Sequence, residues 1–191
     1  MREARIEDKE TIIDILSEAF DANQSVNYII PQDKSRMHRI RRLMSYSYNI
    51  CKLFGEVFVT EDGKGCALVL FPDQKRFSLK GTLSDVQLAL GVIGIKNVYK
   101  AMKREAVIKK HQPDSKLYYI WFIGVTPAAQ GIGIGSQLLS ELIQRATSLK
   151  RTICLETSTL KNIPWYEKQG FKIYKEIDFG YSLYCMKYEY H

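Results

Sequence analysis

The chain has 191 residues, of which 46% are hydrophobic and 26% are charged, as in an ordinary globular protein that can bury a core. Its net charge of +7 suits a nucleic acid, an acidic surface or a polyanionic small molecule. No apolar run approaches the roughly 20 residues of a membrane span, and the N-terminus lacks the apolar core of a signal peptide. We therefore expect a cytoplasmic protein without a membrane segment.

The first third of the chain is expected to form two helices and a hairpin. Asp62-Gly63 lies between two apolar runs, which is a strong signal for a β-hairpin. Basic residues gather at 34–42, on a predicted helix, where a solvated face is the simplest interpretation. In chain order we expect a strand at 2–6, a helix from Glu7 or Asp8 to Phe20, a loop at 23–33, a helix at 35–53, and strands at 56–60 and 66–71.

Residues 73–115 are predicted to be a mainly helical insertion. Leu88, Val92, Ile95, Tyr99 and Met102 recur at helical spacing, so we expect them to form its apolar stripe. The insertion either packs against the sheet or covers a binding site as a lid. A second basic run lies in this helix, but neither basic run comes with a nucleic-acid-binding motif, so we do not expect nucleic acid as a partner.

The longest apolar run of the chain spans 117–125 and is followed by a glycine-rich turn and an amphipathic helix. The run LYYIWFIGV has no polar alternate, which predicts a central strand covered on both faces. After it, Gly131, Gly133 and Gly135 remove three side chains at a helix N-terminus. The free N–H groups and the positive end of the helix dipole there favour an anion, above all a phosphate.

The remainder of the chain is expected to complete a mixed α/β sheet. A strand is predicted at 151–157, a short helix at 162–169, and an antiparallel hairpin from strands at 171–177 and 181–188. The cysteines are scattered and form no Cys-x-x-Cys pair, so we interpret them as reduced packing residues and expect no metal. They are Cys51, Cys66, Cys154 and Cys185.

Two other glycine-rich phosphate motifs fit less well. No Gly-Lys-Ser/Thr follows the turn, which excludes a P-loop. In a dinucleotide-binding fold Glu156 would bind the ribose. However, Ser136 occupies the position where that fold needs a third glycine, and too few strands follow for a doubly wound sheet. A dinucleotide-dependent oxidoreductase is therefore a lesser alternative.

Two segments together resemble the GNAT superfamily of N-acetyltransferases. VTPAAQGIGIG at 125–135 is similar to the family's acetyl-CoA signature, Gln/Arg-x-x-Gly-x-Gly/Ala. NIPWYEKQGF at 162–171 is similar to its second signature, an asparagine followed by an aromatic-Tyr-Glu-Lys-x-Gly-Phe run. The resemblance is strong over about 115–190 and looser over the first 70 residues.

The resemblance implies a fold and an activity. The expected fold is a single GNAT domain over 1–191, with the insertion at about 73–115 and a mixed, mostly antiparallel twisted sheet of six to seven strands with helices on both faces. The implied activity is transfer of the acetyl group of acetyl-CoA to a primary amine by direct attack. A non-catalytic acyl-CoA-binding module is the first alternative. Implied partners are acetyl-CoA, a small-molecule or peptide amine and, since family members are often dimers, a second copy of the chain.

The resemblance also implies where the cofactor lies. The diphosphate would sit on the glycine turn, and the backbone of Ile123 and Val125 would pair with the pantetheine arm. Asn162 resembles a family asparagine that contacts this arm, although a helix N-cap would explain it equally well. The implied cofactor-binding residues are Ile123, Gly124, Val125, Gln130, Gly131, Ile132, Gly133, Ile134, Gly135, Ser136 and Asn162.

Two residues are candidates for proton transfer. Tyr166 matches the family tyrosine that protonates the departing thiolate, and a phenol has a pKa suited to that step; its alternative is core packing. Some relatives carry a glutamate on the central strand, but residues 118–121 hold no carboxylate. Glu156 on the neighbouring strand could remove the amine proton directly or through water. It could also be a structural ion-pair partner, and solvent could take the proton instead.

Overall fold

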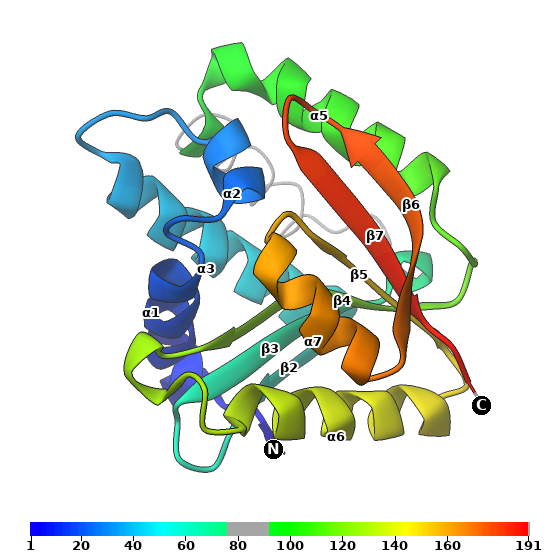
Figure 1. The fold of residues 1–191 in the computed structure, drawn as a ribbon. Coiled ribbons are helices and arrows are strands. Elements are labelled where there is room, and N and C mark those ends of the chain that lie inside the picture. The colour runs from blue at the N-terminus through cyan, green and yellow to red at the C-terminus, as the bar shows by residue number, and fades with distance from the viewer. Residues whose placement is uncertain (76–91, 191) are drawn as a thin grey trace.

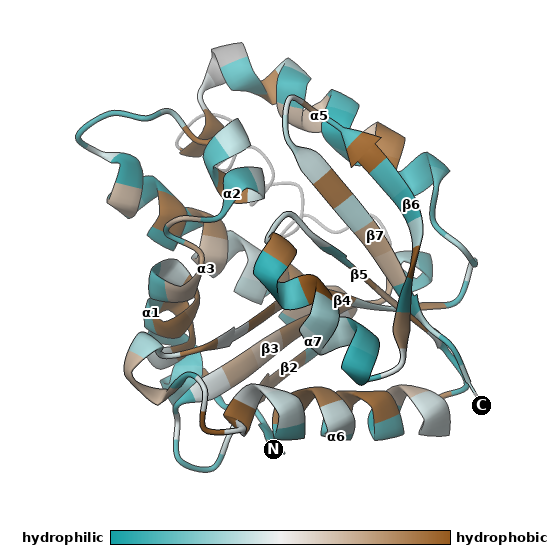
Figure 2. Cartoon of the chain, viewed as in Figure 1, coloured by the Kyte–Doolittle hydropathy of each residue, from teal (hydrophilic) through white to brown (hydrophobic). Residues whose placement is uncertain are grey.

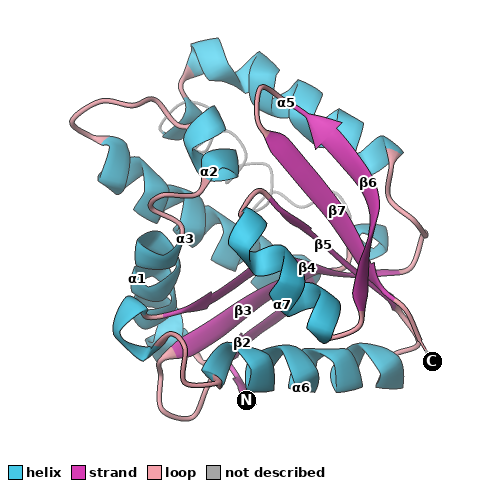
Figure 3. Ribbon diagram, viewed as in Figure 1, coloured by secondary structure: helices cyan, strands magenta, loops and turns pink. Residues whose placement is uncertain are grey.

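The computed structural model describes residues 1–75 and 92–190, and its strands form one seven-stranded sheet (Figures 1 and 3). The strand order is β1-β2-β3-β4-β5-β7-β6. Among the described strands, β4 and β5 are the one parallel pair, and every other neighbouring pair is antiparallel. The strands are β1 (Arg2–Glu3), β2 (Gly55–Val59), β3 (Gly65–Leu70), β4 (Leu117–Val125), β5 (Thr152–Thr157), β6 (Phe171–Asp178) and β7 (Ser182–Tyr188).

Helices cover both faces of this sheet. One core joins α1 and α3 to the sheet, and a second core on the opposite face joins α6 and α7 to it. Figure 2 shows the apolar residues concentrated in the strands between these layers. The helices in the described part of the chain are α1 (Lys9–Ala19), α2 (Gln24–Ile29), α3 (Arg36–Phe54), α5 (Ile95–Lys110), α6 (Ile134–Ser148) and α7 (Ile163–Lys168), with single 3-10 turns at Ile6–Asp8, Pro72–Gln74, Pro127–Ala129 and Leu160–Asn162.

The predicted fold class is confirmed. The central position of 117–125 is confirmed too, because β4 is the fourth of seven strands and is buried along nearly its whole length. A sheet with a single parallel pair among its described strands is not the doubly wound parallel sheet of a dinucleotide-binding fold. All four cysteines are buried and free. No helix in the described ranges combines the length and the apolar character that crossing a bilayer requires.

The predicted loop at 23–33 is wrong, because it contains α2. Asn23 caps this helix: its side-chain oxygen accepts a hydrogen bond of 3.1 Å from the backbone N–H of Val26. Val26 is buried against the α1 and α3 core. Capping and burial therefore stabilise a helix of six residues that is too short to show a periodic pattern.

The predicted helical insertion is described only in part, since residues 76–91 lie outside the described residues, and Leu88 with them. Of the rest of the predicted stripe, Val92 is confirmed as a core residue, but Tyr99 and Met102 are wrong. On α5, Tyr99 is 77% exposed and Met102 is 66% exposed. The inward face instead holds Val98, Ala101 and Ile108, whose spacing also fits a helix. Two apolar stripes compete in this sequence, and the one with smaller side chains packs inward.

Candidate active site

The candidate site begins where β4 and β5 separate. Their parallel pairing runs from Leu117 with Thr152 to Tyr119 with Cys154 and stops there. Beyond Tyr119 the edge of β4 that faces β5 has no partner strand in the described part of the chain, while β5 continues to pair with β7. Unpaired backbone in the middle of a sheet offers N–H and C=O groups to a ligand.

A β-bulge at Trp121 changes which side chains point to which face of β4. Ile120 and Phe122 pair with consecutive residues of β3, so Trp121 has no partner of its own. Tyr119 and Phe122 therefore both belong to the core on the α1 and α3 face, whereas Ile120 belongs to the opposite core. Bulges commonly re-aim side chains beside binding sites, and this one gathers aromatic residues on one side of the sheet.

The glycine turn before α6 has an exposed, side-chain-free backbone. Gly131 has φ +83° and Gly133, the N-cap of α6, has φ +97°. A Cβ atom at either position would meet nothing within 4 Å, so the backbone conformation, not crowding, requires glycine there. Gly135 lies within the helix, where a Cβ atom would make ordinary contacts with Trp165 and Val125 at 3.6 and 3.7 Å.

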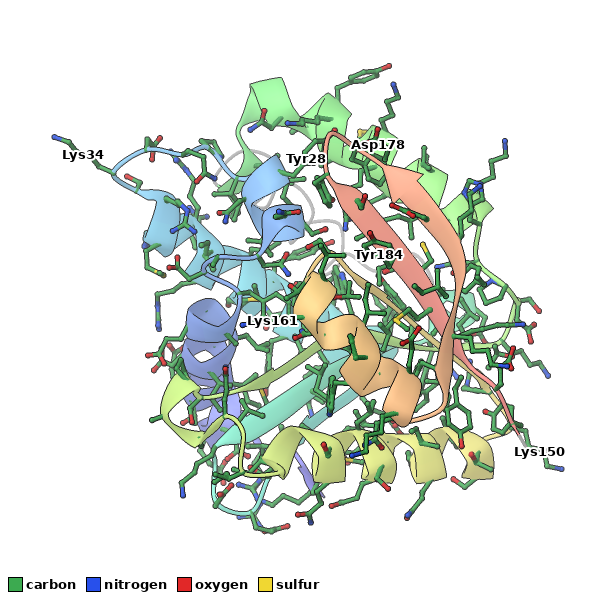
Figure 4. All side chains as sticks on the ribbon, viewed as in Figure 1. Tyr28, Lys34, Lys150, Lys161, Asp178 and Tyr184 are labelled. Atoms are coloured by element: carbon green, nitrogen blue, oxygen red, sulfur yellow. The ribbon has the colours of Figure 1, made fainter. Side chains whose placement is uncertain are left out.

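The first of two cavities lies over this turn and has a volume of about 510 Å³. We call it the glycine cavity. Lys161, in the 3-10 turn just before α7 (Figure 4), adds a positive charge to its lining. Ile132 and Ile134 are not among the lining residues, and Ile132 is 72% exposed. The other predicted cofactor residues line it together with Tyr166: Ile123, Gly124, Val125, Gln130, Gly131, Gly133, Gly135, Ser136 and Asn162.

Side-chain hydrogen bonds hold the walls of the glycine cavity together. The Gln130 amide donates to the carbonyl oxygen of Val125 at 3.1 Å, which fixes the turn against the end of β4. The Trp165 indole donates to Ser136 Oγ at 2.9 Å, which joins α7 to α6. Asn162 occupies the N-cap position of α7, but its side chain makes no capping hydrogen bond, so capping does not explain its amide.

The second cavity has a volume of about 520 Å³ and lies on the α1 and α3 side of β4. We call it the aromatic cavity, after the five aromatic residues in its lining: Phe20, Tyr46, Tyr119, Trp121 and Phe122. Helix α5 contributes to its wall from Ala101 to Lys109. Phe20 and Asn23 line both cavities. The two cavities therefore meet where α1 ends and α2 begins.

Glu156 lies in the aromatic cavity, not in the glycine cavity. The Tyr119 hydroxyl donates a hydrogen bond to its Oε2. Its Oε1 is buried and has no hydrogen-bond partner among the described residues. Burial raises the pKa of the Glu156 carboxyl to about 7, although the Tyr119 hydrogen bond and the charge of Arg104 act in the opposite direction. A carboxyl with this pKa can accept and release protons near neutral pH.

Arg104 joins three elements at the rim of the aromatic cavity. Its Nε donates to the Tyr181 hydroxyl at 3.1 Å, its Nη2 to Ser25 Oγ at 2.6 Å, and its Nη1 to Glu105 at 2.6 Å. The guanidinium thus connects α5 to α2 and to the turn between β6 and β7. Figure 4 shows Tyr28 of α2 beside the same turn, and its ring lies 5.2 Å from that of Tyr181.

Tyr166 both packs in the core and lines the glycine cavity. It is 5% exposed, and its ring lies 4.5 Å from that of Trp165 and 5.8 Å from that of Phe171. Burial raises the pKa of the phenol above its usual value, so it is protonated at neutral pH. The two interpretations made from the sequence, packing and a position at the site, are compatible here.

Sequence reasoning missed several residues of the two cavities. Tyr119 and Arg104 come together with Glu156 only through the sheet register and the approach of α5, and no local motif marks them. Lys161 is one of many lysines, and nothing in its neighbours distinguishes it. Asn23 did carry a signal, since an asparagine three residues before a buried valine is typical of a helix start.

Comparison with known proteins agrees with this architecture. A family model described as the acetyltransferase (GNAT) family matches residues 53–171, more than half of the chain. The match includes the glycine turn, β5 and α7.

Solved structures of similar fold extend over nearly the whole chain. A protein from Corynebacterium glutamicum, described as histone acetyltransferase HPA2 and related acetyltransferase, is 22% identical with a TM-score of 0.71, and the match covers 97% of this chain and 93% of that one. The C-terminal condensation domain of Ebony, solved with beta-alanyl-dopamine, is 11% identical with a TM-score of 0.69, covering 99% and 97%. Arylalkylamine N-acetyltransferase 2 from Aedes aegypti is 14% identical with a TM-score of 0.61, covering 97% and 95%. At these identities the likeness establishes the fold.

Proposed function

Because the chain belongs to the GNAT family of acetyltransferases, we propose that it transfers the acetyl group of acetyl-CoA to a primary amine by direct attack. The observation that carries this proposal is the meeting of the two cavities at Phe20 and Asn23, beside the point where β4 and β5 separate. One cavity offers a glycine turn to an anion, and the other offers a carboxylate. A thioester placed in the first would face an amine placed in the second.

The glycine cavity suits the cofactor in charge and in shape. The N-terminus of α6 and the lysine at 161 would hold the diphosphate through backbone N–H groups and a positive charge. The unpaired edge of β4 at Ile123 and Val125 would hydrogen-bond the pantetheine arm, and Asn162 would contact it from α7. Ile132 and Ile134 would take part only through their backbone.

Glu156 is proposed as the general base. An ammonium cannot attack a thioester, so a proton must leave the nitrogen first, and a carboxylate whose pKa is about 7 accepts it near neutral pH. Tyr119 holds Oε2 of this carboxylate, and Oε1, which is buried without a hydrogen-bond partner among the described residues, would accept the proton. The nitrogen then forms the C–N bond to the acetyl carbon, and the second proton, which it loses as the amide forms, replaces the proton that the general acid gives to the sulfur.

Tyr166 is proposed as the general acid. As the C–S bond breaks, the sulfur takes the bonding electron pair, and the resulting thiolate needs a proton. The phenol of Tyr166 lines the glycine cavity and is protonated at neutral pH because burial raises its pKa. The same burial makes it a weaker acid than an exposed phenol, so proton donation depends on the basicity of the thiolate beside it.

Two measurements test this function. Calorimetry with acetyl-CoA should give binding with a stoichiometry near one, and a thiol-release assay should detect CoA when amines are added. Binding of acetyl-CoA without CoA release from any amine would favour the non-catalytic acyl-CoA-binding module. An absence of binding would contradict both.

A further inference from the structure

We propose, on the basis of the acetyltransferase function above, that the acceptor is a hydrophobic monoamine: a single ammonium group on an aromatic or branched aliphatic body. Its binding site is the aromatic cavity. The lining of that cavity supplies a carboxylate with one oxygen that has no hydrogen-bond partner among the described residues, a wall of aromatic rings and a further apolar wall.

The aromatic wall consists of four rings in contact. The ring centroids of Phe20 and Phe122 are 5.0 Å apart, those of Trp121 and Phe122 are 5.5 Å apart, and those of Tyr46 and Trp121 are 6.2 Å apart. Phe122 is 7% exposed, while the other three are only partly buried although they pack against a core. Their remaining accessible area lines the cavity, where it would contact a flat or branched apolar group.

The second wall is aliphatic. It comes from α2, α3 and residue 93, and it includes Val26, Ile29, Leu43 and Ile93. A volume of about 520 Å³ lies within the range of small-molecule sites. A small hydrophilic amine would leave these walls in contact with water, whereas a phenyl or isobutyl group would cover them.

Glu156 provides the position for the single positive charge. Its Oε1 is buried and has no partner among the described residues, and a buried carboxylate oxygen without a donor is costly. An ammonium supplies both the donor and the opposite charge. Glu105, the other carboxylate in the described part of the lining, already pairs with Arg104.

Further charges on the acceptor are disfavoured. Among the described lining residues the cations Lys75, Arg104 and Lys109 outnumber the carboxylates Glu105 and Glu156, so a second ammonium would be repelled there. A carboxylate beside the amine would be repelled by Glu156, and the charge of the nearby Arg104 is already paired with Glu105. Polyamines and amino acids therefore fit less well than a monoamine.

A panel of four amines tests the proposal with acetyl-CoA and CoA-thiol release. We expect kcat/KM for 2-phenylethylamine and isoamylamine to exceed that for ethanolamine and spermidine by about ten-fold or more, since burying one such apolar group is worth about 1.5–3 kcal/mol. If ethanolamine or spermidine is acetylated as efficiently, the substrate class is wrong while the acetyltransferase function stands. If no amine releases CoA, the proposed acetyltransferase function fails. Calorimetry on the CoA-bound protein then tests the amine site by itself. Preferential binding of 2-phenylethylamine would support that site, and equal binding of all four amines would overturn it.

Matched variants on α5 place the acceptor in the cavity. Ala101 lines the cavity, so Ala101→Phe should fill it and raise KM for 2-phenylethylamine at least ten-fold, with the Kd of acetyl-CoA within two-fold of the wild-type value. Met102, the next residue, is 66% exposed, and Met102→Phe should change neither constant. Ala106→Phe, at a more exposed lining position, replaces Ala101→Phe if that variant does not fold. An unchanged KM in a folded cavity-filling variant would contradict the assignment.

Discussion

The two cavities that meet at Phe20 and Asn23 are built from different parts of the chain. The glycine cavity relies on backbone: a helix N-terminus, two glycines with positive φ and the unpaired edge of one strand. The aromatic cavity relies on side chains from α2, α3 and α5, on Phe20 at the end of α1, and on both strands at the split. The first would recognise a ligand through groups that every residue has, and the second through groups specific to this chain.

This difference predicts how each cavity responds to substitution. A backbone-built site depends on conformation, so it tolerates changes in most side chains but not in the glycines that allow the turn. A side-chain-built site can be altered by one substitution at its wall. Changes in the glycine cavity should therefore affect acetyl-CoA with every amine, and changes in the aromatic cavity should affect the amine alone.

The largest effect is expected from Glu156→Gln. Loss of the general base should lower kcat by about 10²–10⁴-fold, while the Kd of acetyl-CoA stays within two-fold because Glu156 lies outside the glycine cavity. The control is Glu176→Gln, an exposed carboxyl on β6, which should behave as wild type. A weaker affinity of Glu156→Gln for acetyl-CoA would show that the two cavities do not bind their ligands independently.

Tyr166→Phe should lower kcat by about 100-fold, at the low end of the range for general acid catalysis. Tyr188→Phe is the matched control, because the rings of Tyr166 and Tyr188 pack against Phe171 at 5.8 and 5.7 Å but Tyr166 alone of the two lines the glycine cavity. Thermal unfolding of both variants measures the packing role separately. Unchanged turnover in a stable Tyr166→Phe protein would remove the acid assignment.

Gly133→Ala should weaken acetyl-CoA binding by about ten-fold, the size expected when a hydrogen bond to a charged group is lost. The matched variant is Gly63→Ala in the hairpin turn, which also has positive φ and open space around its Cβ position. Both should lower Tm by a few degrees, because the strain costs about 1–3 kcal/mol. Calorimetry should show weaker acetyl-CoA binding in Gly133→Ala only. If Gly133→Ala and Gly63→Ala bind acetyl-CoA equally well, the glycine turn does not hold the cofactor.

The smallest expected effect is a shift in the pH at which kcat/KM begins to fall. The pKa of Glu156 is raised to about 7, and the base must be ionised, so kcat/KM should fall tenfold per pH unit below that value. Tyr119→Phe removes the hydrogen bond that lowers this pKa, so the inflection should move to higher pH. The folding stability should change with pH in the opposite direction to the rate. A carboxyl whose pKa is raised in the folded protein stabilises it at low pH, and this stabilisation is lost as the pH rises through about 7.

The stability effect gives a second readout of the same group. Glu156→Gln should raise Tm relative to wild type at pH 8 and have little effect near pH 4.5, because a buried charge is removed only where the carboxyl is ionised. An inflection near the ordinary pKa of a glutamate, in both the rate and the stability profile, would show that Glu156 is solvated and would contradict its placement in the aromatic cavity.

The same difference between the cavities explains what could be predicted from the sequence. The strand at 117–125, the glycine turn and the sheet were predictable because strand alternation, helical periodicity and the φ of glycine are local properties. The approach of Arg104 to Ser25 and Tyr181 depends on how α2, α5 and a distant turn pack together, and no local pattern encodes it. The inward face of α5 was mispredicted because Tyr99 and Met102 look like core residues without the context of the sheet.

The most direct test of the account is a crystal structure with acetyl-CoA bound. We predict that the diphosphate lies on the backbone N–H groups of residues 131–135, that the pantetheine arm follows the unpaired edge of β4, and that the thioester lies beside Phe20 and Asn23, open to Glu156. A diphosphate bound elsewhere, or a thioester directed away from the aromatic cavity, would contradict the account.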